Sequence, residues 1–223
     1  MADTSLSALP ITTVILAGGR SMRMGVDKTQ IPLAGLPLVA RAAKNAHEFS
    51  QHVIVVTNRI EELPTEYLPN NLVVLKDAVA YQGPLGGLST ALPEVQDEWV
   101  LAQAADMPWV KYEVVEELYR HIEEHDVVIA VGPNGPEPLL ALYRTATVKP
   151  VAEKVIASGR RRLVAMFDDL RVCEIPLEDI RRIDPDLRSF FNINTQIELA
   201  EAQEMADALG LSSPEEDAEL LDR

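Results

Sequence analysis

Short apolar runs that alternate with helix-like segments constrain the fold of this chain more than any other feature. The expected strands are the β-branched runs Thr13–Leu16, His52–Thr57, Leu72–Leu75, Trp99–Ala104 and Val127–Val131. Between them, helical periodicity covers Leu38–Glu48, Leu85–Val95 and Lys111–Glu124. Some of the strands are almost wholly apolar, which indicates a sheet buried on both faces. We therefore predict a Rossmann-like three-layer α/β/α fold with a mostly parallel sheet.

The second half of the chain continues this pattern without a visible domain boundary. Further elements are expected, extended at Glu137–Arg144 and Arg171–Ile175 and helical at Thr147–Ser158, Arg162–Asp168 and Thr195–Leu209. Neither an internal repeat nor a low-complexity linker interrupts the 223 residues, so we expect one domain over residues 1–211. Residues 212–223 are small, polar and acidic, and we expect them to form a flexible C-terminal tail.

The charge and the cysteine content exclude several classes of function. The net charge of −15 argues against nucleic acid or an anionic membrane as the main partner. No apolar stretch approaches the roughly 20 residues that span a bilayer, and the N-terminus lacks the apolar core of a signal peptide. Cys173 is the only cysteine and lies in an apolar run, so we expect a buried structural thiol in a reducing compartment. These features predict a cytoplasmic protein.

The first expected strand runs directly into a glycine-rich, basic turn, which reads LAGGRSMRMGVDK from Leu16 to Lys28. The turn contains three glycines and three basic residues, Gly18, Gly19, Gly25, Arg20, Arg23 and Lys28. Glycines let main-chain N–H groups approach a ligand closely, and the cations suit a polyanion such as a nucleoside triphosphate. Two residues separate Gly25 from Lys28, which excludes a Walker-type loop. Ligands of doubly wound sheets bind beyond the carboxyl ends of strands, which favours a triphosphate site here; the alternative is a solvated basic loop.

Polar residues at two other segment ends are candidates for holding a metal ion. Asp106 follows the apolar strand Trp99–Ala104, and an acid at this point is well placed to bind Mg²⁺; it could instead begin a turn before Pro108 or cap a helix. Asn192 and Asn194 precede the last expected helix. Either could cap that helix, or an asparagine carbonyl could complete a magnesium shell.

Three more segments have both a functional and a structural interpretation. Asp77 follows the third strand, and the turn Gln82–Gly87, which includes Gly83, leads into a helix. This turn could pass close beneath a base or sugar, or its glycines could serve close packing. Asn58 ends the second strand, where a simple turn is the alternative to a binding role. The run Arg160–Arg162 could grip a second phosphate or form a solvated helix start.

Together these segments resemble the molybdenum cofactor guanylyltransferases, a family of the nucleotidyltransferase superfamily. Residues 16–28 match the family pattern L-A-G-G-x-S-x-R-M-G-x-D-K at each specified position. The other similar segments follow in the family's order, and they are Gln82–Leu88, Asp106–Pro108, Glu137–Tyr143, Gly159–Leu163 and Asn192–Thr195. The resemblance runs from about Thr13 to Ala202 and implies a fold of the nucleotidyltransferase type.

The resemblance implies a reaction in which GTP is joined to molybdopterin with Mg²⁺ and pyrophosphate is released. Arg23 and Lys28 would contact phosphates, and Asp106 would hold Mg²⁺ with Asn194. The nucleotide would be bound by Leu16, Ala17, Gly18, Gly19, Lys28, Asn58, Asp77, Gly83 and Asp106. Relatives that use CTP tend to carry L-A-A-G at residues 16–19, so Gly18 and Gly19 favour GTP.

Two alternatives to this function stay open. One is a sister enzyme that uses CTP or another phosphorylated acceptor. The other is a non-catalytic protein of the same fold that escorts the cofactor to its apoenzyme. The presence of Arg23, Lys28 and Asp106 argues against an idle escort, whereas the acidic tail would suit one as a docking segment. The expected partners are GTP, molybdopterin and a recipient molybdoenzyme or delivery protein, with neither nucleic acid nor membrane.

Overall fold

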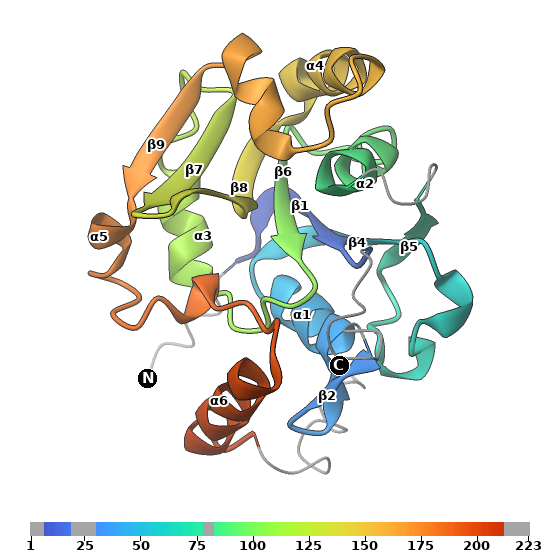
Figure 1. Ribbon diagram of the computed structural model, residues 1–223, viewed down its shortest axis with the longest axis vertical. Helices are drawn as coiled ribbons and strands as arrows, with labels where there is room; N and C mark the ends of the chain where they lie inside the picture. The colour runs from blue at the N-terminus through green and yellow to red at the C-terminus, as the bar shows by residue number, and fades with distance from the viewer. Residues whose placement is uncertain (1–6, 19–29, 78–82, 212–223) are drawn as a thin grey trace.

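Seven strands form one mixed sheet with helices packed against both of its faces (Figure 1). The computed structural model describes residues 7–18, 30–77 and 83–211. The strands of the sheet are β1 (Leu9–Leu16), β4 (Ser50–Thr57), β5 (Val73–Lys76), β6 (Trp99–Ala104), β7 (Val127–Gly132), β8 (Gly135–Arg144) and β9 (Val172–Pro176). Their order across the sheet is β5-β4-β1-β6-β8-β7-β9. Strand β8 pairs antiparallel with both of its neighbours, and every other pair is parallel, so the prediction of a mostly parallel sheet is confirmed.

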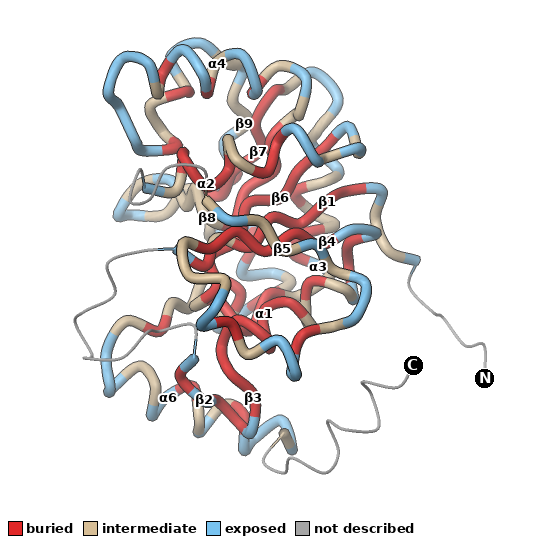
Figure 2. Tube along the Cα trace, turned by 90° about the vertical axis from the view of Figure 1, so that its right-hand side faces the viewer, coloured by how far each residue is buried: buried red, intermediate tan, exposed pale blue. Residues whose placement is uncertain are grey.

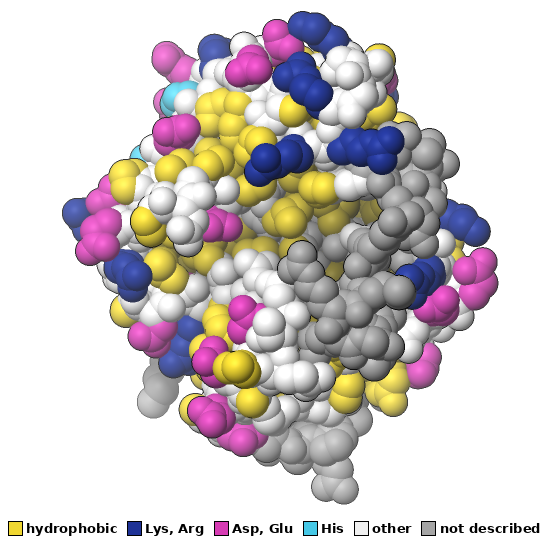
Figure 3. All heavy atoms as spheres, in the orientation of Figure 1, with side chains coloured by type: hydrophobic (Ala, Val, Ile, Leu, Met, Phe, Trp, Pro, Cys, Tyr) yellow, Lys and Arg dark blue, Asp and Glu magenta, His cyan; other side chains and the backbone are white. Residues whose placement is uncertain are grey.

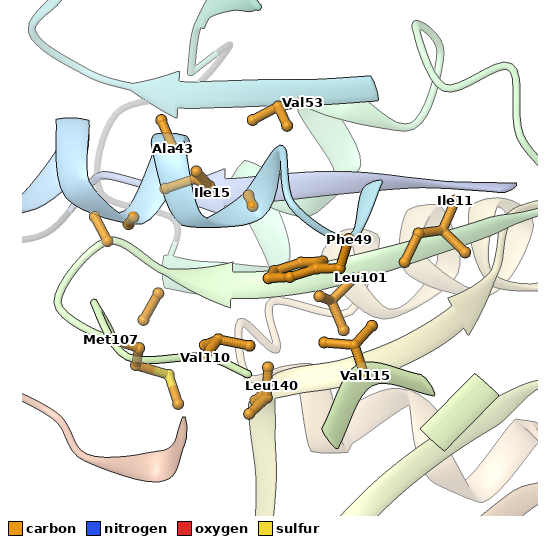
Figure 4. Close-up of a cluster of buried hydrophobic side chains, with 14 of the residues drawn as sticks. Ile11, Ile15, Ala43, Phe49, Val53, Leu101, Met107, Val110, Val115 and Leu140 are labelled. Atoms are coloured by element: carbon orange, nitrogen blue, oxygen red, sulfur yellow. The ribbon is translucent and has the colours of Figure 1, made fainter. Parts of the chain in front are cut away.

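The helices cover the two faces of the sheet and complete three layers. They are α1 (Leu38–Ala46), α2 (Gly83–Ala91), α3 (Tyr112–Tyr119), α4 (Thr145–Ala157), α5 (Leu177–Ile180) and α6 (Gln196–Ala208). Helices α1 and α3 pack on one face in a cluster that contains Ile15 and Leu101, part of which is drawn in Figure 4. Helices α2 and α4 pack on the other face around Val14 and Val100. Adjacent residues of β1 therefore enter opposite clusters, as the period of a strand requires, and the central strands are buried along most of their length (Figure 2).

A third, smaller cluster attaches α6 to the rest of the molecule. It joins Ala202 and Ala206 of α6 to Trp109 and to a two-stranded hairpin, β2 (Pro32–Leu33) and β3 (Leu36–Pro37). The buried Arg41 of α1 holds this hairpin, since its guanidinium donates to the carbonyl oxygens of residues 33 and 34 at 3.0 and 2.7 Å. Figures 1 and 2 both show α6 and the hairpin together at one end of the molecule.

Several element boundaries differ from the prediction. Strand β1 begins at Leu9 instead of Thr13, and the helix expected over Lys111–Glu124 ends at Tyr119. The segment predicted as a helix over Arg162–Asp168 is a 3₁₀ helix, η4 (Leu163–Asp169). Its two buried side chains, at positions 163 and 166, are three residues apart, which is the period of a 3₁₀ turn.

Three other expectations concern Cys173, membrane-spanning helices and the C-terminal tail. Cys173 is half-buried against the cluster under α1 and α3, and burial raises the pKa of its thiol, which agrees with a structural role. Among the described residues, the structure contains no helix of the length and apolar character needed to cross a membrane. The expected acidic tail, residues 212–223, lies outside the described residues, so its boundary stays a prediction.

Candidate functional site

The carboxyl ends of β1, β4, β5 and β6 lie side by side at one edge of the sheet, and the chain extends the parallel pairing by one residue there. The N–H of Ala17 donates to the carbonyl of Val56 at 2.8 Å, and the N–H of Asp77 donates to the carbonyl of Thr57 at 2.8 Å. The N–H of Ala105 similarly donates to the carbonyl of Leu16, at 3.3 Å. These bonds bring Gly18, Asn58, Asp77 and Asp106, predicted from separate segments, to this common edge.

Gly18 and Asn58 face each other across the ends of β1 and β4. A Cβ atom added to Gly18 would lie 3.6 Å from Nδ2 of Asn58. The Oδ1 atom of the same amide is buried and has no hydrogen-bond partner in the part of the chain that the structure describes. A buried acceptor left unpaired costs about 1–3 kcal/mol, so a ligand that donates an N–H here would be bound favourably.

Asp77 is connected to helix α2 through Thr90. The Thr90 hydroxyl lies 3.2 Å from Oδ1 of Asp77 and 3.0 Å from the carbonyl oxygen of Gly86. The carboxylate is half-buried, so one of its oxygens is held by the helix while the residue stands at the strand end. This contact orients Asp77 before any ligand arrives.

The second glycine-rich turn has structural reasons for its glycines. Gly83 has a φ of +73°, and a Cβ atom there would meet the carbonyl oxygen of Arg161 at 3.0 Å. A Cβ atom on Gly87 would come within 2.8 Å of a methyl carbon of Leu16. The packing interpretation therefore accounts for both positions, and the predicted ligand contact of Gly83 stays a prediction.

Asp106 lies in a turn that is held from two sides. The fully buried Gln103 donates from Nε2 to the carbonyl of Met107 at 3.0 Å. The N–H of Ile193 donates to the carbonyl of Asp106 at 3.0 Å, which joins the segment before α6 to this turn. Asn194 follows directly, and its Nδ2 donates to the carbonyl of Asn192 at 3.4 Å. The two predicted metal-binding residues, although 88 positions apart in the sequence, are thus joined through one backbone hydrogen bond.

The arginine run lies beside the start of α2, because the N–H of Leu85 donates to the carbonyl of Arg161 at 3.4 Å. All three side chains of Arg160–Arg162 are exposed, and Arg160 is within 3.6 Å of Asp168. On the face drawn in Figure 3, Lys and Arg side chains border an area where hydrophobic side chains gather, in the region of α2 and η4. The run is therefore close to the predicted site, and its phosphate role stays a prediction.

The remaining predicted residues are Gly19, Arg23 and Lys28, and they lie outside the described residues. The structure adds two polar residues that are not among the predicted site residues. Glu137 of β8 is half-buried, and burial raises the pKa of its carboxyl. Glu198 of α6 binds the segment that contains Asn194. The spacing Thr195-x-x-Glu198, which is a helix-capping signature, is the sequence signal that could have singled out Glu198.

The fold and the site at the strand ends are those of a nucleotidyltransferase. Comparison with known proteins agrees with this class. The model of the MobA-like NTP transferase domain matches residues 13–172, which is more than half of the chain. The protein belongs to this family of MobA-like NTP transferases. It is therefore an enzyme of nucleotidyl transfer.

The similarity to individual relatives covers most of this chain. The chain is 34% identical over 195 residues to the molybdenum cofactor guanylyltransferase of Desulfosudis oleivorans, with 86% of this chain and 94% of the relative covered. The probable molybdenum cofactor guanylyltransferase of Peptoclostridium acidaminophilum is 33% identical, with coverages of 84% and 86%. Among solved structures, the molybdopterin-guanine dinucleotide biosynthesis protein A of Archaeoglobus fulgidus has a TM-score of 0.76 at 31% identity, with coverages of 88% and 99%. The predicted family and fold type are confirmed.

Proposed function

We propose that this protein transfers GMP from GTP to the terminal phosphate of molybdopterin and releases pyrophosphate in a Mg²⁺-dependent reaction. Relatives named as molybdenum cofactor guanylyltransferases support this choice of substrates. The observation that carries the proposal is the hydrogen bond from the N–H of Ile193 to the carbonyl of Asp106. This bond holds the segment that contains Asn194 against the turn that contains Asp106, at the ends of the strands. Strand ends are where doubly wound sheets bind nucleotides.

The reaction requires two anions to meet. An oxygen of the pterin phosphate forms a bond to the α-phosphorus of GTP, and the bond from that phosphorus to the bridging oxygen of pyrophosphate breaks. The attacking phosphate is already ionised at neutral pH, so no general base is needed. Catalysis then consists of in-line positioning and charge neutralisation, with little covalent work for the protein.

In this proposal, different side chains of the site would bind the metal ion and the phosphates. Asp106 and Asn194 would hold Mg²⁺ through oxygen atoms, which are the ligands that this cation prefers. Mg²⁺ bound there would supply positive charge to the phosphates. Arg23 and Lys28 would bind the phosphates that become pyrophosphate. The described residues contain no group of three or more acidic, histidine or cysteine side chains that could hold a metal ion, so in this proposal phosphates and water would supply the other ligands of Mg²⁺.

The guanosine would occupy the ends of β1, β4 and β5. Its pocket would be formed by Leu16, Ala17, Gly18, Gly19, Asn58, Asp77 and Gly83. The buried Oδ1 of Asn58, which has no hydrogen-bond partner among the described residues, supports this placement, since the base edge of guanine carries N–H donors. Cytosine also carries an amino group, so the preference for GTP rests on the resemblance and on Gly18, where the relatives that use CTP tend to carry alanine. The product would pass to a molybdoenzyme or a delivery protein in the cytoplasm.

Pyrophosphate release tests the proposal, measured with molybdopterin, Mg²⁺ and either GTP or CTP. Release with GTP alone is the expected result, and release with CTP alone would overturn the base assignment. Binding of GTP without any turnover would favour the escort function. In the same assay, Asp106→Asn should lower kcat by about 100-fold or more, because charge stabilisation at phosphates is worth several kcal/mol. The exposed Asp186→Asn is the matched control, and its activity should equal that of the wild type.

A further inference from the structure

Helix α6 begins with a capping arrangement that reaches one residue further upstream than usual. The Thr195 hydroxyl accepts from the N–H of Glu198 at 3.2 Å, as in an ordinary capping box. The Glu198 carboxylate normally returns to the N–H of the capping residue itself. Here its Oε2 atom accepts from the N–H of Asn194 at 2.7 Å and from the Thr195 hydroxyl at 3.0 Å. The carboxylate thus holds the candidate metal ligand directly.

Asn194 is fixed on its other side by Ile193. This side chain is fully buried in the third cluster with Trp109 and Ala202, and its N–H donates to the carbonyl of Asp106. Two successive N–H groups, those of Ile193 and Asn194, are therefore bound to Asp106 and Glu198. Since α6 is anchored by the same cluster, the helix forms a base from which Glu198 holds the segment against the Asp106 turn.

The donor end of the Asn194 amide is bound within its own segment. Its donor end, Nδ2, is directed at the carbonyl of Asn192 at 3.4 Å. Its other end is Oδ1, which is the kind of oxygen that Mg²⁺ accepts. If the backbone N–H of Asn194 lost its partner, only the bond from Ile193 would hold this segment to the Asp106 turn. The bond to Glu198 involves a charged acceptor at short distance and is of the stronger class of hydrogen bond.

We propose that Glu198 is a positioning residue of this enzyme, acting through Asn194 to keep the metal–nucleotide site assembled. The inference rests on the proposed function, because it assumes that Asp106 and Asn194 hold the cation. In this proposal Asn194 binds the cation, and Glu198 binds the segment that contains Asn194. Its removal should therefore weaken metal binding and leave the fold in place, since the cluster that anchors α6 is unchanged.

A metal-binding titration without turnover is the first test. Mn²⁺ replaces Mg²⁺ as the probe, and water-proton relaxation reports its affinity for the protein with GTP present and no acceptor. Glu198→Ala should weaken Mn²⁺ binding about tenfold, which is the scale of one hydrogen bond to a charged group. Glu198→Gln keeps an acceptor oxygen and should recover most of the affinity. Glu201→Ala removes the same charge from an exposed position on α6 and should bind like the wild type.

Combined variants separate positioning from a direct effect. If Glu198 acts through Asn194, then Asn194→Ala and the double variant with Glu198→Ala should bind Mn²⁺ equally weakly. A further loss in the double variant would contradict the proposal, as would wild-type affinity in Glu198→Ala. Thermal unfolding of each variant should show a transition close to that of the wild type, and loss of the folded state in both Glu198 variants would mean that the residue is merely structural.

Failure of this inference can be told apart from failure of the proposed function. If Asp106→Asn and Asn194→Ala both leave Mn²⁺ affinity unchanged, the metal site itself is wrong. If both weaken binding while Glu198→Ala does not, only the positioning role is wrong. GMP transfer gives a second readout: Glu198→Ala should raise the Mg²⁺ concentration for half-maximal activity about tenfold, and excess Mg²⁺ should restore kcat.

Discussion

Replacement of Gly18 by alanine separates the needs of a ligand from the needs of the fold. Gly18 is absent from the positions with positive φ, so alanine can adopt its backbone conformation. Among the described atoms, the nearest to the new Cβ would be Nδ2 of Asn58 at 3.6 Å, which is an ordinary van der Waals distance. The substitution also restricts the unfolded chain, which stabilises a protein by about 0.4–1 kcal/mol where the conformation is compatible. We expect the melting temperature to stay level or to rise by up to about 4 °C in a domain of this size.

A bound nucleotide should respond in the opposite direction. If the backbone at Gly18 contacts GTP, an added methyl group would force the ligand outward and weaken its binding by about tenfold or more, equivalent to about 1.4 kcal/mol. Calorimetric titration of GTP with Mg²⁺ measures this affinity, and differential scanning calorimetry measures the melting temperature. Gly87→Ala is the matched comparison, because its Cβ would lie 2.8 Å from a methyl carbon of the half-buried Leu16 and should cost about 1–3 kcal/mol of stability. Wild-type affinity for GTP in Gly18→Ala would refute the contact between GTP and the backbone of Gly18. A large fall in melting temperature would refute the conclusion that the fold has room for a Cβ atom at this position.

Three further substitutions test the charged groups outside the nucleotide pocket. Burial raises the pKa of Glu137, so its charge opposes folding at neutral pH. Glu137→Gln should therefore raise the melting temperature at pH 7. The gain should vanish below about pH 4, where the carboxyl of the wild type is protonated in both the folded and the unfolded state. Burial alone would raise the pKa of Asp184, but the Lys111 ammonium at 2.8 Å and nearby hydrogen bonds hold it below its usual value. Asp184→Asn should cost about 2–3 kcal/mol at pH 7 in urea unfolding. The difference should shrink as the pH falls below about 4, where the unfolded carboxyl becomes protonated, and should be lost only below the lowered pKa of the folded state. Arg144→Lys should cost about 1–2 kcal/mol, since three main-chain carbonyls of residues 122–125 lose the fixed guanidinium donors that bind them.

Periodicity predicted the central layer of the molecule well. The expected strand Trp99–Ala104 coincides with β6, since a strand that is buried on both faces shows a nearly continuous apolar run. The hairpin of β2 and β3 escaped prediction, because two strands of two residues each are too short for any period to be visible. The third cluster escaped as well, since it joins Trp109 to residues of α6 that are about 90 positions away.

The candidate site was predictable as a set of positions but not as a set of contacts. Strand ends after apolar runs identify Gly18, Asn58 and Asp106, and the sheet order then brings them to one edge. Nothing in the sequence pairs the N–H of Ile193 with Asp106, because that bond depends on where α6 packs. Gln103 is similar: a polar residue in an apolar strand stands out, but its bond to Met107 becomes visible only in the folded turn.

The direction of β8 explains why Glu137 is hard to identify from the sequence. Strands β5, β4, β1 and β6 all run the same way, so the residues that follow them lie at one edge, and the strand-end rule finds them. Strand β8 runs the opposite way beside β6, with Leu140 paired to Gln103. The residues of β8 nearest to the Asp106 turn are therefore those that begin the strand, among them Glu137. A rule that inspects only the carboxyl ends of strands passes over them.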